Sequence, residues 1–224
     1  MEIKGVIFDK DGVLLDSEVF ARSKMAMGFR HVGYQLTDEF YNTLLGRTYP
    51  AVKARITAHF GSEEIYTEFR KVFKRLFDEG YRNGEVPLKP GAYELVNFLN
   101  EKKFPICLAT SGSEESIHLG FDNSRFGKNP FANFICGEMV TRSKPDPEIF
   151  LKAAEKIAVP IEKCLIVEDS FSGIKAARRS GGISCMVPDL VQPDAELMNC
   201  IDLLKKDLWE VYDLLVPFTS VSVL

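Results

Sequence analysis

Short apolar segments alternate with amphipathic segments along the second half of the chain. Apolar runs rich in β-branched residues predict strands at 3–8, 106–109, 134–136, 165–167 and 183–187. Between them, apolar residues recur at helical spacing and predict helices at 91–102, 114–120, 148–158 and 173–180. Short buried strands that alternate with helices indicate a parallel sheet covered by helices on both faces.

The segment that follows the first strand has a different pattern. Ile65, Phe69 and Leu76 fall on one helical face, and Lys71 and Arg75 fall on the other. Only one of the 11 prolines precedes residue 87, so long uninterrupted helices are expected before that point. We predict an α/β fold with a Rossmann-like parallel sheet and an inserted all-helical cap. The core comprises 1–16 and 86–224, and the cap comprises 17–85.

Composition narrows the class of protein. The chain has 224 residues, 46% of them apolar, and a mean hydropathy of −0.05, which is typical of a globular protein. The net charge of −4 argues against a nucleic-acid partner. No apolar run approaches the roughly 20 residues of a membrane span, so no membrane partner is expected. The N-terminus shows no secretory pattern, and the five cysteines are widely spaced, so reduced thiols in a cytoplasmic protein are expected. The oligomeric state stays open, and a monomer is compatible with the sequence.

Polar residues follow four of the predicted strands. Asp9 and Asp11 come after the first strand, and Thr110, Ser111 and Gly112 come after the second. Lys144 lies in the loop beyond the third strand, and Glu168 and Asp169 come after the fourth. The carboxyl ends of parallel strands meet at one edge of a sheet, where open α/β sheets bind their ligands. We therefore expect these side chains to converge.

Carboxylates that converge repel one another unless a cation or a proton neutralises them. A Mg²⁺ ion held by few carboxylates, with positions left for water or phosphate, is the simplest solution. Lys144 and the Thr110 to Gly112 loop would then hold a phosphoryl group, which makes a small phosphorylated metabolite the expected substrate. Of the first two acids, one can attack phosphorus and the other can exchange a proton with the leaving alcohol and with water.

Four segments together resemble the haloacid-dehalogenase superfamily: Asp9-Lys-Asp-Gly-Val-Leu-Leu-Asp-Ser17, Thr110-Ser111, Lys144-Pro145 and Glu168-Asp-Ser-Phe-Ser-Gly173. The helical insertion resembles the cap of the group that contains β-phosphoglucomutase and sugar-phosphate phosphatases. The resemblance implies catalysis through a phosphoaspartate, with Asp9 as the nucleophile and Asp11 as the acid/base.

The same resemblance assigns the remaining positions. Thr110 and Lys144 match the residues that hold phosphate. Asp9, Asp169 and the main-chain carbonyl of Asp11 match the Mg²⁺ ligands. Glu168 matches an acidic position whose role varies, and we include it among the candidate metal ligands. Arg47, in the predicted cap, matches a loop that meets the substrate.

Two other classes of protein share part of this pattern. Asp9, Asp11, Gly12 and Glu18 fall at positions three, five, six and twelve of an EF-hand calcium loop, but position one would be Ile7, which offers no ligand oxygen. A phospho-accepting signalling domain also gathers acids and a lysine at a sheet edge, but it needs neither a cap nor a second acid at this spacing. The missing ligand oxygen at Ile7, the predicted cap and the second acid all favour an enzyme, a phosphoric monoester hydrolase.

A phosphomutase remains the closest alternative, because it shares the acids, the cation and the cap. The β-phosphoglucomutase pattern places a histidine twelve residues beyond the nucleophile. This chain has Ala21 there, and the nearest histidine is His31. The sequence therefore favours a phosphatase for a sugar or polyol phosphate.

Overall fold

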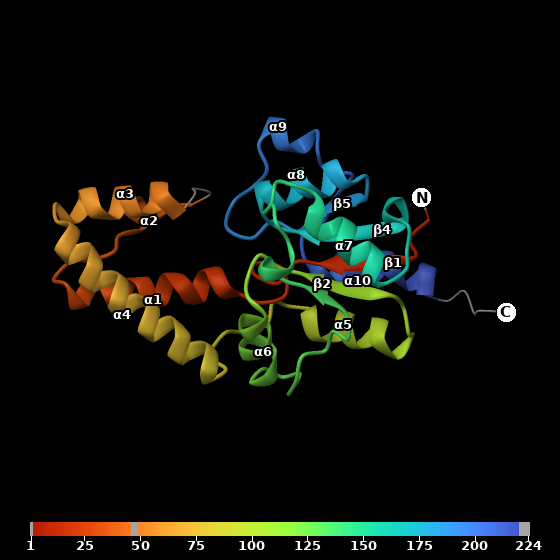
Figure 1. The fold of residues 1–224 in the computed structure, drawn as a ribbon, viewed down its shortest axis with the longest axis horizontal. Helices are drawn as coiled ribbons and strands as arrows, with labels where there is room; N and C mark the ends of the chain where they lie inside the picture. The colour runs from red at the N-terminus through yellow and green to blue at the C-terminus, as the bar shows by residue number, and fades with distance from the viewer. Residues whose placement is uncertain (1, 46–48, 220–224) are drawn as a thin grey trace.

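A six-stranded parallel sheet forms the centre of the computed structural model, which describes residues 2–45 and 49–219 (Figure 1). The strands are β1 (Gly5–Phe8), β2 (Ile106–Ala109), β3 (Phe134–Ile135), β4 (Cys164–Glu168), β5 (Ile183–Met186) and β6 (Leu203–Leu204). Their order is β3-β2-β1-β4-β5-β6, and every neighbouring pair is parallel. The order reverses at β1, so the loop after β1 opens into the crevice where such sheets bind ligands.

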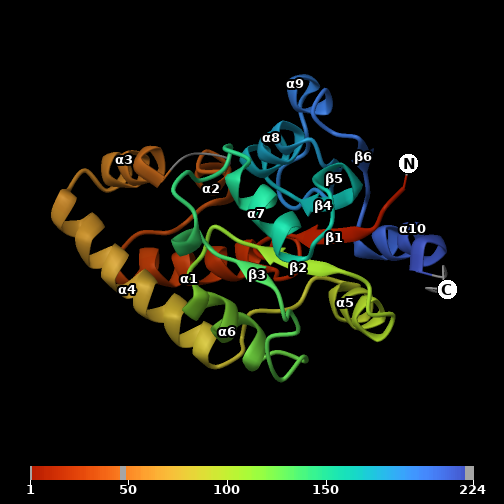
Figure 2. The ribbon, with the colours of Figure 1, turned by 45° about the vertical axis from the view of Figure 1, so that its right-hand side comes forward.

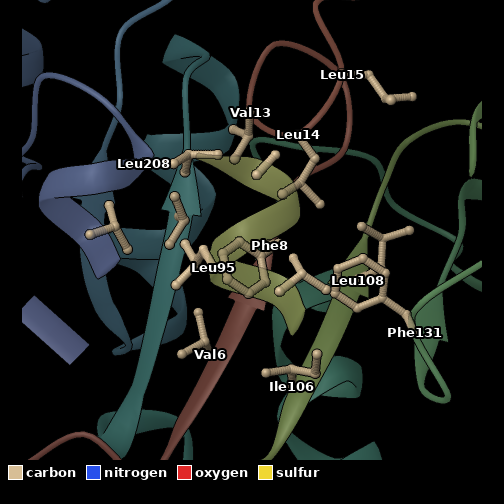
Figure 3. Close-up of a cluster of buried hydrophobic side chains, with 14 of the residues drawn as sticks. Val6, Phe8, Val13, Leu14, Leu15, Leu95, Ile106, Leu108, Phe131 and Leu208 are labelled. Carbon is tan, nitrogen blue, oxygen red and sulfur yellow. The ribbon is translucent and has the colours of Figure 1, made fainter. Parts of the chain in front are cut away.

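Helices cover both faces of the sheet, as predicted. Successive residues of each strand point to opposite faces, so Val6 and Phe8 enter one hydrophobic cluster while Ile7 enters the other. The first face is covered by α5 (Ala92–Glu101), α6 (Glu114–Asp122) and α10 (Leu208–Thr219), and Figure 3 shows its side chains around Phe8. The second is covered by α7 (Glu148–Lys156) and α8 (Phe171–Ser180).

The C-terminal part of the sheet was only partly predicted. The pattern gave five strands, and the structure adds β6, α9 (Ala195–Met198) and α10. β6 has two residues and carries an exposed Leu204, so it lacks the apolar run that identified the other strands. Two short 3₁₀ turns, at Gly137–Met139 and Ile161–Lys163, also lie within predicted loops.

The cap is a separate helical lobe beside the sheet, formed by the segment between β1 and α5 (Figures 1 and 2). Its helices are α1 (Ser17–His31), α2 (Asp38–Asn42), α3 (Tyr49–Phe60) and α4 (Glu63–Arg82). They enclose their own aromatic cluster, in which Phe29 lies 4.9 Å from Phe60 and 5.1 Å from Phe69, measured between ring centroids. The class of fold is therefore the predicted α/β core with a helical cap. The domain limits at 16/17 and 85/86 stay a prediction.

Two short segments join the cap to the core, and they run side by side. Leu15 and Leu88 form an antiparallel bridge, the Asp16 amide donates to Pro87 and the Lys89 amide donates to Leu14. The Lys89 ammonium lies 2.6 Å from a carboxylate oxygen of Asp189 in the loop after β5. The two connections therefore contact each other and meet the core at the loop after β5.

Among the described residues, no helix combines the length and the apolarity needed to cross a lipid bilayer.

Replacing Phe29 by alanine tests whether the cap depends on its own core. Phe29 is fully buried among aromatic rings, so the variant should lose about 3–5 kcal/mol of the free energy of unfolding, measured by equilibrium denaturation. The matched control is Val19→Ala on the same helix, where the side chain is half exposed and the expected change is within about 0.5 kcal/mol. A Phe29→Ala loss as small as that of the control would contradict the packing described here.

Candidate active site

The loop after β1 carries the first two acids and is fixed by its own hydrogen bonds. The Asp9 amide still donates to Val167 of β4, and the Leu14 and Leu15 amides both donate to the carbonyl of Lys10. Val13, Leu14 and Leu15 are fully buried in the core, which anchors the far side of the loop. The loop that carries Asp9 and Asp11 is therefore held rigidly at the end of β1.

Lys144 joins the carboxyl ends of three strands, β1, β2 and β4. Its ammonium lies 2.5 Å from Oδ1 of Asp9 and 2.7 Å from Oε1 of Glu168, and it donates to the carbonyl of Ala109 at 3.2 Å. The Lys144 side chain is only 6% exposed. The other Glu168 oxygen accepts hydrogen bonds from the amide and the hydroxyl of Ser170, at the N-terminus of α8. The lysine is thus a buried cation between two acids.

Burial governs the ionisation of this group. It raises the pKa of Asp9 to about 7, assisted by repulsion from Glu168 and Asp11 and opposed by Lys144. Burial alone would lower the pKa of Lys144, but attraction to Asp9 and Glu168 outweighs it, so the net pKa is above its usual value. Burial also raises the pKa of Asp169 well above its ordinary value, with repulsion from Glu168 and Asp9 adding to it. Lys144 alone therefore does not balance these acids, and Asp9 and Asp169 need a further cation or a proton.

Asp169 fits the position of a cation ligand. Its carboxylate makes no hydrogen bond with any described residue and packs against Gly12, where a Cβ atom would lie 2.3 Å from Oδ2. Gly12 has φ +84°, a conformation that favours glycine. Only a residue without a side chain leaves room for this carboxylate beside the loop.

The donor set suits Mg²⁺ rather than an ion enclosed by protein alone. Across residues 2–45 and 49–219, no group of three or more histidine, cysteine or acidic side chains is arranged to hold a metal. Mg²⁺ commonly uses one or two carboxylates together with water and substrate phosphate. Asp9, which is buried, and Asp169, which is half-buried beside the cleft, fit that pattern. Glu168 already uses both oxygens on Lys144 and Ser170.

Asp11 has two partners that the sequence did not indicate. The hydroxyl of Tyr81, in the last turn of α4, donates to Oδ1 at 3.0 Å. Burial raises the pKa of Tyr81, and the charge of Asp11 raises it further, so this hydroxyl is a donor at neutral pH. Lys10, 1% exposed, places its ammonium 3.4 Å from Oδ2 and donates to the carbonyl and hydroxyl of Ser116 on α6. The only sequence signal was Lys10 itself, a charged residue within the first motif.

The loop after β2 meets the site from the other side. Thr110 is buried, and its hydroxyl oxygen accepts the Gly112 amide at 3.0 Å, which leaves the hydroxyl proton available. Ser111 lines a pocket of about 270 Å³ together with Lys144, whereas Gly112 lines a different pocket beside Asp11. The predicted residues of this loop thus lie at the predicted edge of the sheet, but Ser111 and Gly112 line different pockets there.

Two larger clefts open between the cap and the core. One, of about 570 Å³, is lined by Asp11, Ala21, Tyr81 and Gly112, and the other, of about 670 Å³, is lined by Lys144 and Asp169. Glu18 at the start of α1 borders both clefts. Arg47, the predicted substrate contact in the cap, lies outside the described residues.

Comparisons with known proteins agree with this geometry. A family profile described as haloacid dehalogenase-like hydrolase matches residues 3–181. The "Probable pseudouridine-5'-phosphatase" of Drosophila melanogaster is 31% identical over 188 residues, covering 82% of this chain and 80% of that protein. The "Phosphorylated carbohydrates phosphatase" of Thermotoga maritima is 27% identical over 187 residues, covering 80% and 82%. The chain belongs to the haloacid dehalogenase-like hydrolases.

Solved structures share the fold. A hydrolase of this family from Deinococcus radiodurans superposes with a TM-score of 0.81 at 21% identity, covering 99% of both chains. A β-phosphoglucomutase from Clostridium difficile superposes with a TM-score of 0.64 at 21% identity, covering 96% of this chain and 99% of that one.

The predicted family and its enzyme class, a phosphohydrolase, are confirmed by the family profile and the relatives, and the prediction of a calcium-binding module is wrong. The structure also places a strand, not a helix, before the proposed calcium loop.

Replacing Gly173 by alanine tests the support of the Lys144 group. A Cβ atom there would lie 1.7 Å from Oε1 of Glu168, so the carboxylate must leave the position in which Lys144 and Ser170 hold it. The variant should lose about 1–3 kcal/mol of stability through overpacking. A displacement of about 1 Å should cost about 100-fold in the rate of p-nitrophenyl phosphate hydrolysis.

Arg178→Ala near the other end of the same helix is the control, because its side chain is exposed and pairs with the exposed carboxylate of Asp202, away from the clefts. It should keep the rate of the unsubstituted enzyme. A Gly173→Ala enzyme with that same rate would show that the Glu168 position does not matter.

Proposed function

We propose that the protein is a Mg²⁺-dependent phosphatase that hydrolyses a small phosphate monoester, a sugar or polyol phosphate, through an aspartyl-phosphate intermediate. The single observation that carries this proposal is the buried Lys144, which holds Asp9 at the end of β1 and Glu168 at the end of β4. A buried carboxylate held by a cation beside an open cleft is arranged to react rather than to stabilise the fold.

Asp9 is the proposed nucleophile. Lys144 binds its Oδ1, and its Oδ2 makes no hydrogen bond with any described residue. Oδ2 can therefore attack phosphorus, forming an O–P bond as the bond from phosphorus to the leaving oxygen breaks. Water then attacks the same phosphorus and releases inorganic phosphate and the free Asp9 carboxylate.

Asp11 is the proposed acid/base. It lies two residues beyond the nucleophile on the same rigid loop and borders the 570 Å³ cleft. It gives a proton to the leaving alcohol in the first step and takes one from water in the second.

Lys144, Thr110, Ser111 and Gly112 are proposed to hold the phosphoryl group. The Lys144 ammonium already faces the nucleophile, and the Thr110 hydroxyl proton is free to point at a phosphoryl oxygen. These donors match the negative charge that develops on the transferred group. Glu168 then acts by fixing Lys144, and Arg47 is proposed to reach the substrate from the cap.

Asp9, Asp169 and the main-chain carbonyl of Asp11 would hold Mg²⁺. When bound, the ion supplies positive charge for the phosphoryl oxygens and lowers the repulsion between the acids. Glu168, which the sequence also suggested as a ligand, is proposed to contribute through Lys144.

The substrate class rests on the size of the clefts and on the similar proteins. Volumes of about 570 and 670 Å³ suit a small metabolite. One similar protein acts on phosphorylated carbohydrates, as its name states. A cytoplasmic location is proposed because all five cysteines are free thiols.

Removal of the metal tests the proposal. Hydrolysis of p-nitrophenyl phosphate should fall to background in excess chelator and return on addition of Mg²⁺, because the acids then lose their cation. Asp9→Asn should abolish turnover in Mg²⁺ while the thermal unfolding midpoint stays near that of the unsubstituted protein. Full activity in chelator, or in Asp9→Asn, would rule the mechanism out.

A second assay separates phosphatase from phosphomutase. Ala21 lines the cleft beside Asp11 and carries no titratable group, so water is expected to reach the phosphoaspartate. With β-glucose 1-phosphate, Mg²⁺ and a bisphosphate primer, inorganic phosphate should appear faster than glucose 6-phosphate. The reverse order would assign the protein to the phosphomutases.

A further inference from the structure

Tyr81 is a cap residue whose side chain reaches the catalytic loop of the core. It lies in the last turn of α4 and is 5% exposed. Its hydroxyl donates a hydrogen bond to Oδ1 of Asp11 at 3.0 Å, across 70 residues of sequence. No sequence motif of the core includes this residue.

The ring of Tyr81 is held by packing on both sides. The Phe77 ring lies 4.8 Å away, and the Phe20 ring meets it edge-on at 5.8 Å, measured between centroids. Gly80 allows this approach, because a Cβ atom there would lie 2.3 Å from the Phe20 ring. The hydroxyl therefore has little freedom to leave Asp11.

The end of α4 is itself fastened to the core. Asn123, which follows α6, donates its side-chain amide to the carbonyl of Arg82 at 2.9 Å, and Gly84 packs closely against Asn123. The contact between Tyr81 and Asp11 thus lies where the cap joins the core.

The two oxygens of Asp11 have different surroundings. Oδ1 accepts from Tyr81, whereas Oδ2 faces the Lys10 ammonium at 3.4 Å, beyond a short hydrogen bond. A protonated Asp11 that accepts from Tyr81 at Oδ1 carries its proton on Oδ2. When this proton passes to the leaving oxygen, the O–H bond at Oδ2 breaks, and the carboxylate that remains is stabilised by Tyr81 and Lys10.

We propose that Tyr81 is a positioning residue that orients Asp11 for proton transfer to the leaving group. This inference rests on the proposed function, because it assigns a partner to the proposed acid/base. Tyr81 contacts Asp11 and not the reacting phosphorus, so its removal should affect leaving groups that need a proton more than those that do not.

The experiment compares Tyr81→Phe with the unsubstituted enzyme on two esters, p-nitrophenyl phosphate and phenyl phosphate, in Mg²⁺. Phenylalanine keeps the ring packing and removes only the hydroxyl. Because phenolate is the poorer leaving group, kcat/KM for phenyl phosphate should fall about tenfold, the effect of one lost hydrogen bond to a charged group. The value for p-nitrophenyl phosphate should fall by less than about twofold, because nitrophenolate needs little protonation.

A matched control removes a different cap hydroxyl. Tyr34 donates to the carbonyl of Phe60 within the cap, so Tyr34→Phe loses a similar hydrogen bond away from Asp11 and should leave both rates unchanged. In an Asp11→Asn background, Tyr81→Phe should no longer change the ratio of the two rates, because the residue acts through Asp11.

Three outcomes would overturn the inference alone: equal losses on both esters, no loss on either, or an unchanged effect in the Asp11→Asn background. An unsubstituted enzyme that hydrolyses neither ester in Mg²⁺ would instead overturn the proposed function, and the inference with it.

Discussion

The burial of acidic groups at the end of β1 is the constraint on which the rest of the structure depends. Asp9 and Glu168 are buried and Asp169 is half-buried, so the charged forms of these acids need partners nearby. Lys144 supplies one positive charge and contacts two of the three acids. Asp169 has no such partner among the described residues, which is the physical basis for the cation and the substrate phosphate that we propose at this site.

The supports of this group are glycines and backbone groups rather than further charges. Gly12 and Gly173 each leave a space that an acidic side chain fills, Asp169 in the first case and Glu168 in the second. The Ser170 amide and hydroxyl hold Glu168 at the start of α8. Fixed carboxylates lower the cost of reorganisation when charge moves during the reaction, which is the usual source of rate enhancement at such sites.

The cap covers the site and also contributes residues to it. Its last helix is fastened beside α6 and carries Tyr81 to Asp11, while its two connections run together past Lys89. The cleft beside Asp11 and the cleft beside Lys144 and Asp169 both lie between cap and core, so the cap forms a wall of the site. Chemistry at the sheet edge and the placement of the cap are thus linked through a few contacts.

Patterns in the sequence predicted five of the six strands, the helical insertion and the sheet edge at which the acids, Thr110 and Lys144 gather. These features follow from local patterns, because apolar runs identify buried strands and parallel strands end at a common edge. The sequence did not show β6, whose two residues carry no such pattern. The folded structure was needed to show which acids contact Lys144 and that Tyr81 and Lys10 flank Asp11. Those contacts join residues up to 135 positions apart, and no local spacing encodes them.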